Sequence, residues 1–114
     1  MKISIITSVW NNKETIKDAI ESVLSQTYKN IEYIVVDGAS SDGTIEIVQK
    51  YRDNITKFIS EKDSGIYDGL NRGISLATGD VVAFLHSDDI YANYTIIEEI
   101  AQQFASDESL DGIY

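Results

Sequence analysis

The chain has 114 residues, of which 43% are hydrophobic and 25% are charged, and its formal net charge is −10. This composition is typical of one globular domain and excludes an intrinsically disordered chain, which has too few hydrophobic residues to build a core. The lack of cysteine excludes disulfides and thiolate metal sites. The strong negative charge argues against nucleic-acid partners and against a polybasic membrane patch, because both need a basic surface.

Strand and helix patterns alternate along the sequence. Short runs of β-branched and aromatic residues indicate strands, and hydrophobic residues spaced three and four apart indicate helices. In chain order the patterns predict a strand (2–9), a helix (13–26) with Asn12 as its N-cap, a strand (31–37), a turn (38–43), a helix (44–51), a weaker strand (55–61), a helix (66–77) with Gly79 as its C′ residue, a strand from residue 81, a helix (93–104) and a last strand (110–114).

This order predicts an α/β fold, with a mostly parallel sheet and helices on both faces, because strands joined through helices form right-handed crossovers. The chain stops at the last predicted strand, so we expect it to be the front part of a longer protein. The hydrophobic runs are far shorter than a membrane span, and a strand pattern begins at once where a signal peptide would stand. We therefore expect a cytoplasmic protein.

Polar residues follow four of the predicted strands, where an open α/β sheet binds its ligands. One such cluster alone is more often a turn or a helix cap, but four of them on one edge favour a binding site. The clusters are Thr7, Ser8, Trp10, Asn11 and Asn12 after the first strand, Asp37 and Asp42 after the second, Glu61, Lys62 and Asp63 after the third, and His86, Ser87, Asp88 and Asp89 after the fourth.

The fourth cluster indicates a cation site. Residues 81–85 (VVAFL) run directly into His86 and Ser87 and then into the adjacent carboxylates of Asp88 and Asp89, which repel each other. A divalent cation would hold them together, since hard cations bind carboxylate oxygens and bridge to phosphates. The loop at residues 8–13 has no glycine, which argues against both the G-x-G-x-x-G dinucleotide motif and the P-loop.

Five segments closely resemble the family 2 inverting glycosyltransferases, which have the GT-A fold. They are residues 5–12 (IITSVWNN), 19–28 (AIESVLSQTY), 35–44 (VVDGASSDGT), 63–74 (DSGIYDGLNRGI) and 84–89 (FLHSDD). The resemblance covers essentially the whole chain. It implies that residues 1–114 are the Rossmann-like, N-terminal nucleotide-sugar-binding part of a glycosyltransferase domain whose acceptor-binding part is absent.

The resemblance also implies roles for single residues. Thr7, Trp10 and Asn11 would form the floor and edge of the nucleotide pocket. Asp37 would accept the uracil N–H of a UDP-sugar, in a charge-assisted hydrogen bond, and its alternative role is to cap the following turn. Asp68 would reach the sugar or the ribose, or would be a solvated residue of the first helical turn. Further nucleotide contacts are assigned to Asn71 and Ser87.

The metal site follows from the same resemblance. Asp88 matches the metal-binding aspartate of the DxD-type motif, and the cation would be Mn²⁺ or Mg²⁺. Asp89 would bind the cation, orient the site or cap the next helix. His86 stands where family members often have the first aspartate of the motif. It could join the metal site, contact phosphate or a sugar hydroxyl, or pack at the strand end. The chain departs from the family further at Gly38 and Leu70, which replace a frequent aspartate and a common arginine.

The implied reaction is transfer of a sugar from a nucleotide diphosphate, UDP by preference, to a saccharide or lipid-linked acceptor with inversion, as in polysaccharide biosynthesis. The family's catalytic general base lies beyond this segment, so the chain should bind a donor and not turn over. The alternatives are a GT-A-like sugar nucleotidyltransferase and a non-catalytic nucleotide-binding fragment. Peripheral binding to the inner face of the membrane would be compatible with this function. We also expect the chain to self-associate near residues 110–114 through exposed hydrophobic surface.

Overall fold

The computed structural model describes residues 1–62, 66–87, 90 and 95–106. Its elements are β1 (Ile3–Val9), α1 (Ile16–Leu24), β2 (Ile31–Asp37), α2 (Thr44–Gln49), the 3₁₀ turn η1 (Arg52–Asn54), β3 (Lys57–Ser60), α3 (Ile66–Leu76), β4 (Val81–Phe84) and α4 (Ile96–Ser106). The predicted alternation of strands and helices is confirmed. The predicted last strand, at residues 110–114, lies outside the described residues. Within the described part of the chain, no helix combines the length and hydrophobicity needed to cross a membrane.

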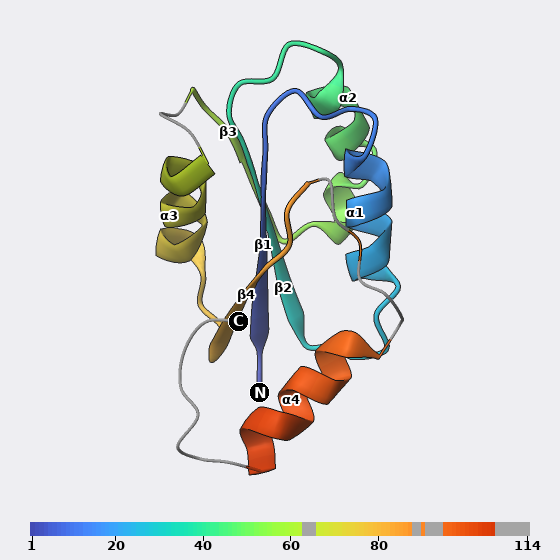
Figure 1. The fold of residues 1–114 in the computed structure, drawn as a ribbon, viewed down its shortest axis with the longest axis vertical. Helices are drawn as coiled ribbons and strands as arrows, with labels where there is room; N and C mark the ends of the chain where they lie inside the picture. Colours follow the sequence, from blue (N-terminus) through green and yellow to red (C-terminus); the bar gives the residue numbers. More distant parts are fainter. Residues whose placement is uncertain (63–65, 88–89, 91–94, 107–114) are drawn as a thin grey trace.

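The four strands form one parallel sheet in the order β3-β2-β1-β4 (Figure 1). The chain moves outward from β1 through β2 to β3 and then returns to the other side of β1. The direction of winding therefore reverses between β1 and β4. In an open α/β sheet the crevice beyond the carboxyl ends of the strands at such a reversal is the usual ligand position. The topology thus favours a site where β1 and β4 end, with the end of β2 next to it on the other side of β1.

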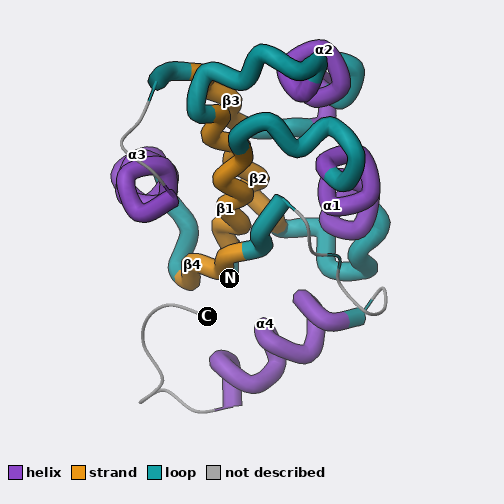
Figure 2. Tube along the Cα trace, turned by 45° about the horizontal axis from the view of Figure 1, so that its top comes forward, coloured by secondary structure: helices purple, strands orange, loops and turns teal. Residues whose placement is uncertain are grey.

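Helices cover both faces of the sheet, as predicted (Figure 2). The larger core cluster lies on the face covered by α1, α2 and α4, and includes the fully buried Ile5, Ile20 and Tyr33. The smaller cluster lies under α3 and is built on Ile6 and Ile34, which are the β-strand neighbours of residues in the first cluster. Side chains that alternate between two hydrophobic cores explain why the strands are nearly continuous hydrophobic runs.

Helix α1 begins later than predicted, and its N-cap is Thr15 instead of Asn12. The carbonyl of Asn12 accepts hydrogen bonds from the amides of Thr15 and Ile16, which closes a turn before the helix. The side chain of Asn12 donates to Ser87 at the end of β4 (2.9 Å). The cap prediction was therefore wrong because a tertiary contact uses the side chain that the local pattern assigned to the helix.

The role predicted for Gly79 is also wrong. Helix α3 ends at Leu76, and Gly79 does not have the positive φ of a C′ residue. A Cβ atom at Gly79 would lie 2.6 Å from the Ser4 Oγ and 2.8 Å from the Lys2 carbonyl oxygen. Glycine is needed here because the turn before β4 passes directly against the backbone of β1.

A buried carboxylate anchors this turn to the sheet. Glu32, at the start of β2, accepts hydrogen bonds from the Ser4 hydroxyl and from the amide and hydroxyl of Thr78, each at 2.8 Å. The Lys57 ammonium lies 3.3 Å from the same carboxylate. Burial alone would raise the pKa of Glu32, but these hydrogen bonds lower it from 4.5 to about 2. At pH values above the folded pKa, the charged form of Glu32 therefore stabilises the fold.

We predict that Glu32→Gln removes a pH-dependent part of the stability. The folded pKa lies below the unfolded value, so the contribution is fully present above pH 4.5 and is lost as the pH falls toward 2. When the pH is lowered from about 6 to about 3, the free energy of unfolding measured with urea should fall by about 2 kcal/mol more in wild type than in the variant. Glu46→Gln, at an exposed position of α2, is the matched control. Equal pH profiles for wild type and Glu32→Gln would contradict this role.

Candidate functional site

The loops that follow β1 and β2 meet at the carboxyl edge of the sheet. The Asn11 amide donates to the Ser40 hydroxyl, and the Ser41 amide donates to the Asn11 side-chain oxygen, both at 2.8 Å. Asn11 and Ala39 both have a positive φ, of 46° and 65°. Such backbone is uncommon for residues other than glycine and needs support from its surroundings. The reciprocal bonds between the two loops supply that support.

Asp37 is the centre of this arrangement. Asp37 is fully buried (0% exposed). Its carboxylate accepts three hydrogen bonds. They come from the Ser40 amide (2.8 Å), the Ser40 hydroxyl (2.5 Å) and the Ser60 hydroxyl at the end of β3 (2.8 Å). Capping of the turn, the alternative role for Asp37, is therefore observed. A carboxylate offers about four acceptor positions, and contact between Asp37 and a base stays a prediction.

The end of β4 is held by the loop that follows β1. Beyond β4, the Leu85 amide donates to the Ile6 carbonyl (3.0 Å) in a further bond to β1. Ser87, 8% exposed, then accepts a bond at its hydroxyl from the Asn12 side-chain amide (2.9 Å) and a bond at its carbonyl from the Thr15 hydroxyl (2.7 Å). The segment that leads to the acidic pair is thus fixed from the side of β1.

The other predicted nucleotide contacts are spread over the fold. Trp10 is 65% exposed at the end of β1, whereas Thr7 is fully buried, with its hydroxyl 2.9 Å from that of Tyr33. Asn71 is exposed in the middle of α3, on the opposite face of the sheet from α1. The side chain of Asp68 lies outside what the structure describes. The structure therefore brings Trp10, Asn11, Asp37 and Ser87 to one edge and leaves Thr7 beneath it.

The predicted metal ligands can be followed only in part. His86 is exposed directly after β4, and Asp88 and Asp89 lie outside the described residues. Among the residues that are described, no group of three or more histidine, aspartate or glutamate side chains could hold a metal ion. The described donors alone thus do not fit a metal site, and the role of Asp88 stays a prediction.

A second carboxylate organises the loops next to Asp37. Asp42 accepts hydrogen bonds from the amide and the hydroxyl of Thr44 (3.0 and 2.5 Å) and from the Lys13 amide (3.2 Å). The hydrogen bond from the Thr44 hydroxyl is the main cause that lowers the pKa of Asp42 below its usual value. Asp42, a residue predicted at this edge, therefore ties the start of α2 to the loop before α1.

Sequence reasoning missed several residues that shape the site. Ser40 could have been found, because an aspartate or asparagine often bonds to the backbone a few residues later in a turn. Ser60 gave no local signal, since it reaches Asp37 only through the register of β2 and β3, where the two residues are paired. Thr15 gave no local signal either, because its hydroxyl bonds to Ser87, which is distant in sequence, and not to its own helix.

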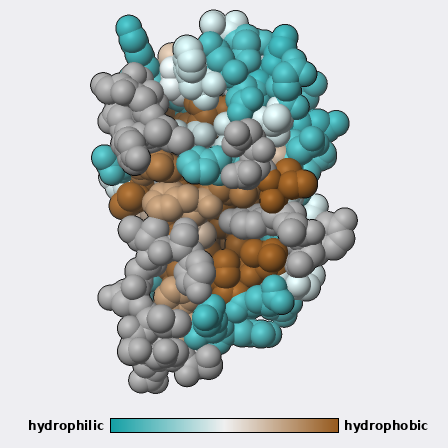
Figure 3. All heavy atoms as spheres, in the orientation of Figure 1, coloured by the Kyte–Doolittle hydropathy of each residue, from teal (hydrophilic) through white to brown (hydrophobic). Residues whose placement is uncertain are grey.

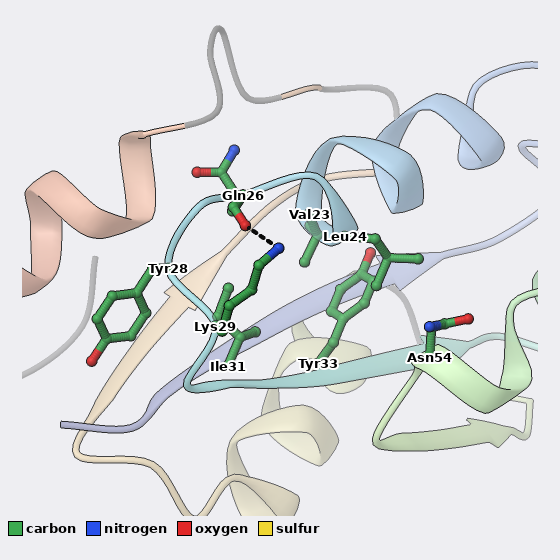
Figure 4. Close-up of a pocket in the computed structure, with 8 residues that line it drawn as sticks. All are labelled: Val23, Leu24, Gln26, Tyr28, Lys29, Ile31, Tyr33 and Asn54. Carbon is green, nitrogen blue, oxygen red and sulfur yellow. Dashed lines mark hydrogen bonds between the residues drawn. The ribbon is translucent and has the colours of Figure 1, made fainter.

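A separate hollow of about 260 Å³ lies at the other end of the sheet, beside the start of β2 (Figure 4). Its lining mixes hydrophobic side chains with one cation, Lys29, whose ammonium donates to the Gln26 carbonyl at 2.9 Å. The lining residues are Val23, Leu24, Gln26, Tyr28, Lys29, Ile31, Tyr33 and Asn54. This hollow is distant from the carboxyl edge and is no part of the candidate site.

Comparison with known proteins decides the family. The sequence profile described as "Glycosyl transferase family 2" matches residues 4–111. The chain belongs to glycosyltransferase family 2. "UDP-Glc:alpha-D-GlcNAc-diphosphoundecaprenol beta-1,3-glucosyltransferase WfaP" of Escherichia coli is 40% identical to it over 101 residues, covering 86% of this chain and 39% of that protein. "Putative glycosyltransferase EpsE" of Bacillus subtilis (strain 168) is 39% identical over 93 residues, covering 78% of this chain and 34% of that protein.

Solved structures share the fold of this chain. Staphylococcus aureus TarS 1-349 in complex with UDP-GlcNAc matches with a TM-score of 0.86 at 28% identity, covering 93% of this chain and 32% of that one. Mannosyltransferase PcManGT from Pyrobaculum calidifontis, in complex with GDP-Man and Mn²⁺, matches with a TM-score of 0.84 at 22% identity, covering 91% and 32%. The predicted Rossmann-like GT-A fold is confirmed. The chain spans between 32% and 39% of the length of these four proteins.

We predict that Ser40→Ala loosens the loops after β1 and β2. The change removes the hydroxyl that accepts from the Asn11 amide and donates to Asp37. Urea unfolding should show a loss of about 1–3 kcal/mol, because the buried Asp37 carboxylate loses a donor. The Asn11 amide should also exchange its hydrogen faster. Ser41→Ala, at the exposed neighbouring serine, is the control, and equal effects of the two variants would contradict the role of Ser40.

Proposed function

We propose that this chain is the donor-binding part of a glycosyltransferase that transfers a sugar from a UDP-sugar to an acceptor hydroxyl with inversion. The observation that carries the proposal is the network around Asp37. It sets two loops at the point of the sheet where α/β proteins bind ligands. The resemblance of residues 35–44 to the family's nucleotide-binding segment supports the same place. The uracil N–H would donate to the acceptor position of the Asp37 carboxylate that Ser40 and Ser60 do not occupy.

Uridine is the favoured base for two reasons. The name of the Escherichia coli relative specifies UDP-Glc as its donor, and the similar Staphylococcus aureus structure contains UDP-GlcNAc. Both proteins match this chain over most of its length. Trp10 would flank the bound nucleotide, because its exposed ring stands at the end of β1 beside Asn11. Aromatic faces of this kind stack on bases.

The proposal includes a divalent cation, Mn²⁺ or Mg²⁺, held by Asp88 with Asp89 and His86 as candidate partners. When bound, such a cation neutralises the charge of a departing diphosphate. This chain's own described residues would bind and orient the nucleotide: Asp37 fixes the loop after β2, and Ser87 fixes the approach to Asp88. The general base that deprotonates the acceptor is proposed to lie beyond residue 114, so the chain alone should bind a donor without sugar transfer.

The wider setting is proposed on the same basis. The acceptor would be a saccharide or a lipid-linked saccharide, and the protein would work in the cytoplasm or at the inner face of the membrane. Self-association of this chain is proposed because hydrophobic residues gather over part of the face drawn in Figure 3. Large hydrophobic side chains that are exposed in the described part of the chain include Trp10, Ile74 and Ile90.

Titration with UDP in the presence of Mn²⁺ tests the donor proposal. Trp10 is the single tryptophan of the chain, so its fluorescence reports on this edge without a label. We predict that UDP changes the Trp10 emission of wild type, and that Asp37→Asn weakens UDP binding at least about tenfold through loss of a charge-assisted hydrogen bond. Asp18→Asn, at an exposed position of α1, is the matched control and should bind as wild type does.

A second variant separates binding from folding. Asp37→Asn also disturbs the turn at Ser40, whereas Trp10→Ala changes an exposed side chain. Calorimetry should show weaker UDP binding in Trp10→Ala together with an unchanged circular dichroism spectrum. The proposal fails when folded wild type binds no UDP, or when both variants bind UDP as tightly as wild type. The first result would favour a domain whose carboxyl edge binds no uridine nucleotide.

A further inference from the structure

We propose that Thr15 and Asn12 are positioning residues that fix the main chain at Ser87 and couple it to the loop that binds the base. The inference rests on the proposed donor site, because it assigns the loop after β1 to the base and the end of β4 to the diphosphate. It assigns a function to two side chains that neither contact the nucleotide in that proposal nor stabilise the helix beside them.

Thr15 departs from the usual behaviour of its position. It is the N-cap residue of α1, where a threonine hydroxyl normally accepts a bond from an amide of the first turn and contributes about 1 kcal/mol. Here its side chain makes no cap hydrogen bond. The hydroxyl instead donates to the Ser87 carbonyl at 2.7 Å, across 72 positions of sequence. A helix N-cap that uses its side chain elsewhere departs from the usual local pattern, and such departures are expected at functional sites.

The side chain of Asn12 also bonds to Ser87 instead of capping the nearby helix. Its side-chain amide donates to the Ser87 hydroxyl at 2.9 Å, and its backbone amide donates to the Thr44 hydroxyl at 3.0 Å. Thr44 in turn donates to Asp42, which accepts from the Lys13 amide. Asn12 therefore joins the end of β4 to the loops after β1 and β2 in one chain of hydrogen bonds.

The two contacts act on a segment that has just left the sheet. β4 ends at Phe84, and the Leu85 amide still bonds to the Ile6 carbonyl. At Ser87 the backbone is held through its carbonyl and the side chain through its hydroxyl, both from the residues that precede α1. Two anchors on one residue fix both its backbone and its side chain. A shift of the base-binding loop would therefore move Ser87 with it.

The test compares uridine with UDP, in the same buffer with Mn²⁺, by calorimetry. Thr15→Val keeps the shape of the side chain and removes the donor. It should lower UDP affinity about fivefold to tenfold more than uridine affinity, in proportion to one lost hydrogen bond. Thr15→Ser keeps the hydroxyl and should restore the wild-type ratio. Thr27→Val, which removes a hydroxyl that donates to Glu98 at 2.9 Å in an exposed contact, should leave the ratio unchanged.

A second measurement needs no ligand. ¹⁵N relaxation should show more rapid motion of the His86 and Ser87 amides in Thr15→Val than in wild type, Thr15→Ser or Thr27→Val. Unchanged relaxation at Ser87 overturns the positioning role, as does an equal loss of uridine and UDP affinity in Thr15→Val. Wild type that binds neither ligand would overturn the donor site itself and the coupling with it, whereas relaxation would still decide whether Thr15 fixes Ser87.

Discussion

A carboxylate that leaves water must find hydrogen-bond donors, and that constraint acts at both ends of β2. Glu32 is the second residue of the strand and Asp37 is its last, and both residues are buried. The Ser4 hydroxyl and the amide and hydroxyl of Thr78 converge on Glu32 from two other segments, which fixes the turn before β4. Asp37 draws Ser40 and Ser60 together and so fixes the loops at the carboxyl edge. The central part of the sheet and its carboxyl edge therefore depend on two buried carboxylates that share one strand.

The two edges of the sheet serve different purposes although they use similar contacts. At the amino edge the glycine at position 79 lets a turn lie against β1, and none of the described residues there has a positive φ. At the carboxyl edge Asn11 and Ala39 have left-handed backbone, and Thr15 leaves its own helix without a side-chain cap. Such departures cost stability and persist where the surrounding contacts enforce them. Their concentration at one edge agrees with a binding role for that edge.

Much of this arrangement follows from sequence periodicity. Runs such as residues 31–37 and the spacing of Ile16, Ile20 and Val23 sufficed to predict strands, helices and a parallel sheet, because each element has one dominant period. The N-cap and C′ assignments at Asn12 and Gly79 were wrong, since both depend on contacts between segments distant in sequence. Recognition of Asp37 needed only its place after a strand, whereas its partner Ser60 needed the register of β2 and β3. Local patterns do not contain that register.

The central claim is that the carboxyl edge binds the nucleotide. It is tested most directly by amide chemical shifts of ¹⁵N-labelled protein during titration with UDP and Mn²⁺. The account predicts that the largest shifts fall on the loops around Asn11 and Ser40 and on Ser87, while Glu32 and Lys29 at the opposite edge stay unchanged. Shifts centred on the hollow beside Lys29, or no shifts at saturating UDP, would contradict it.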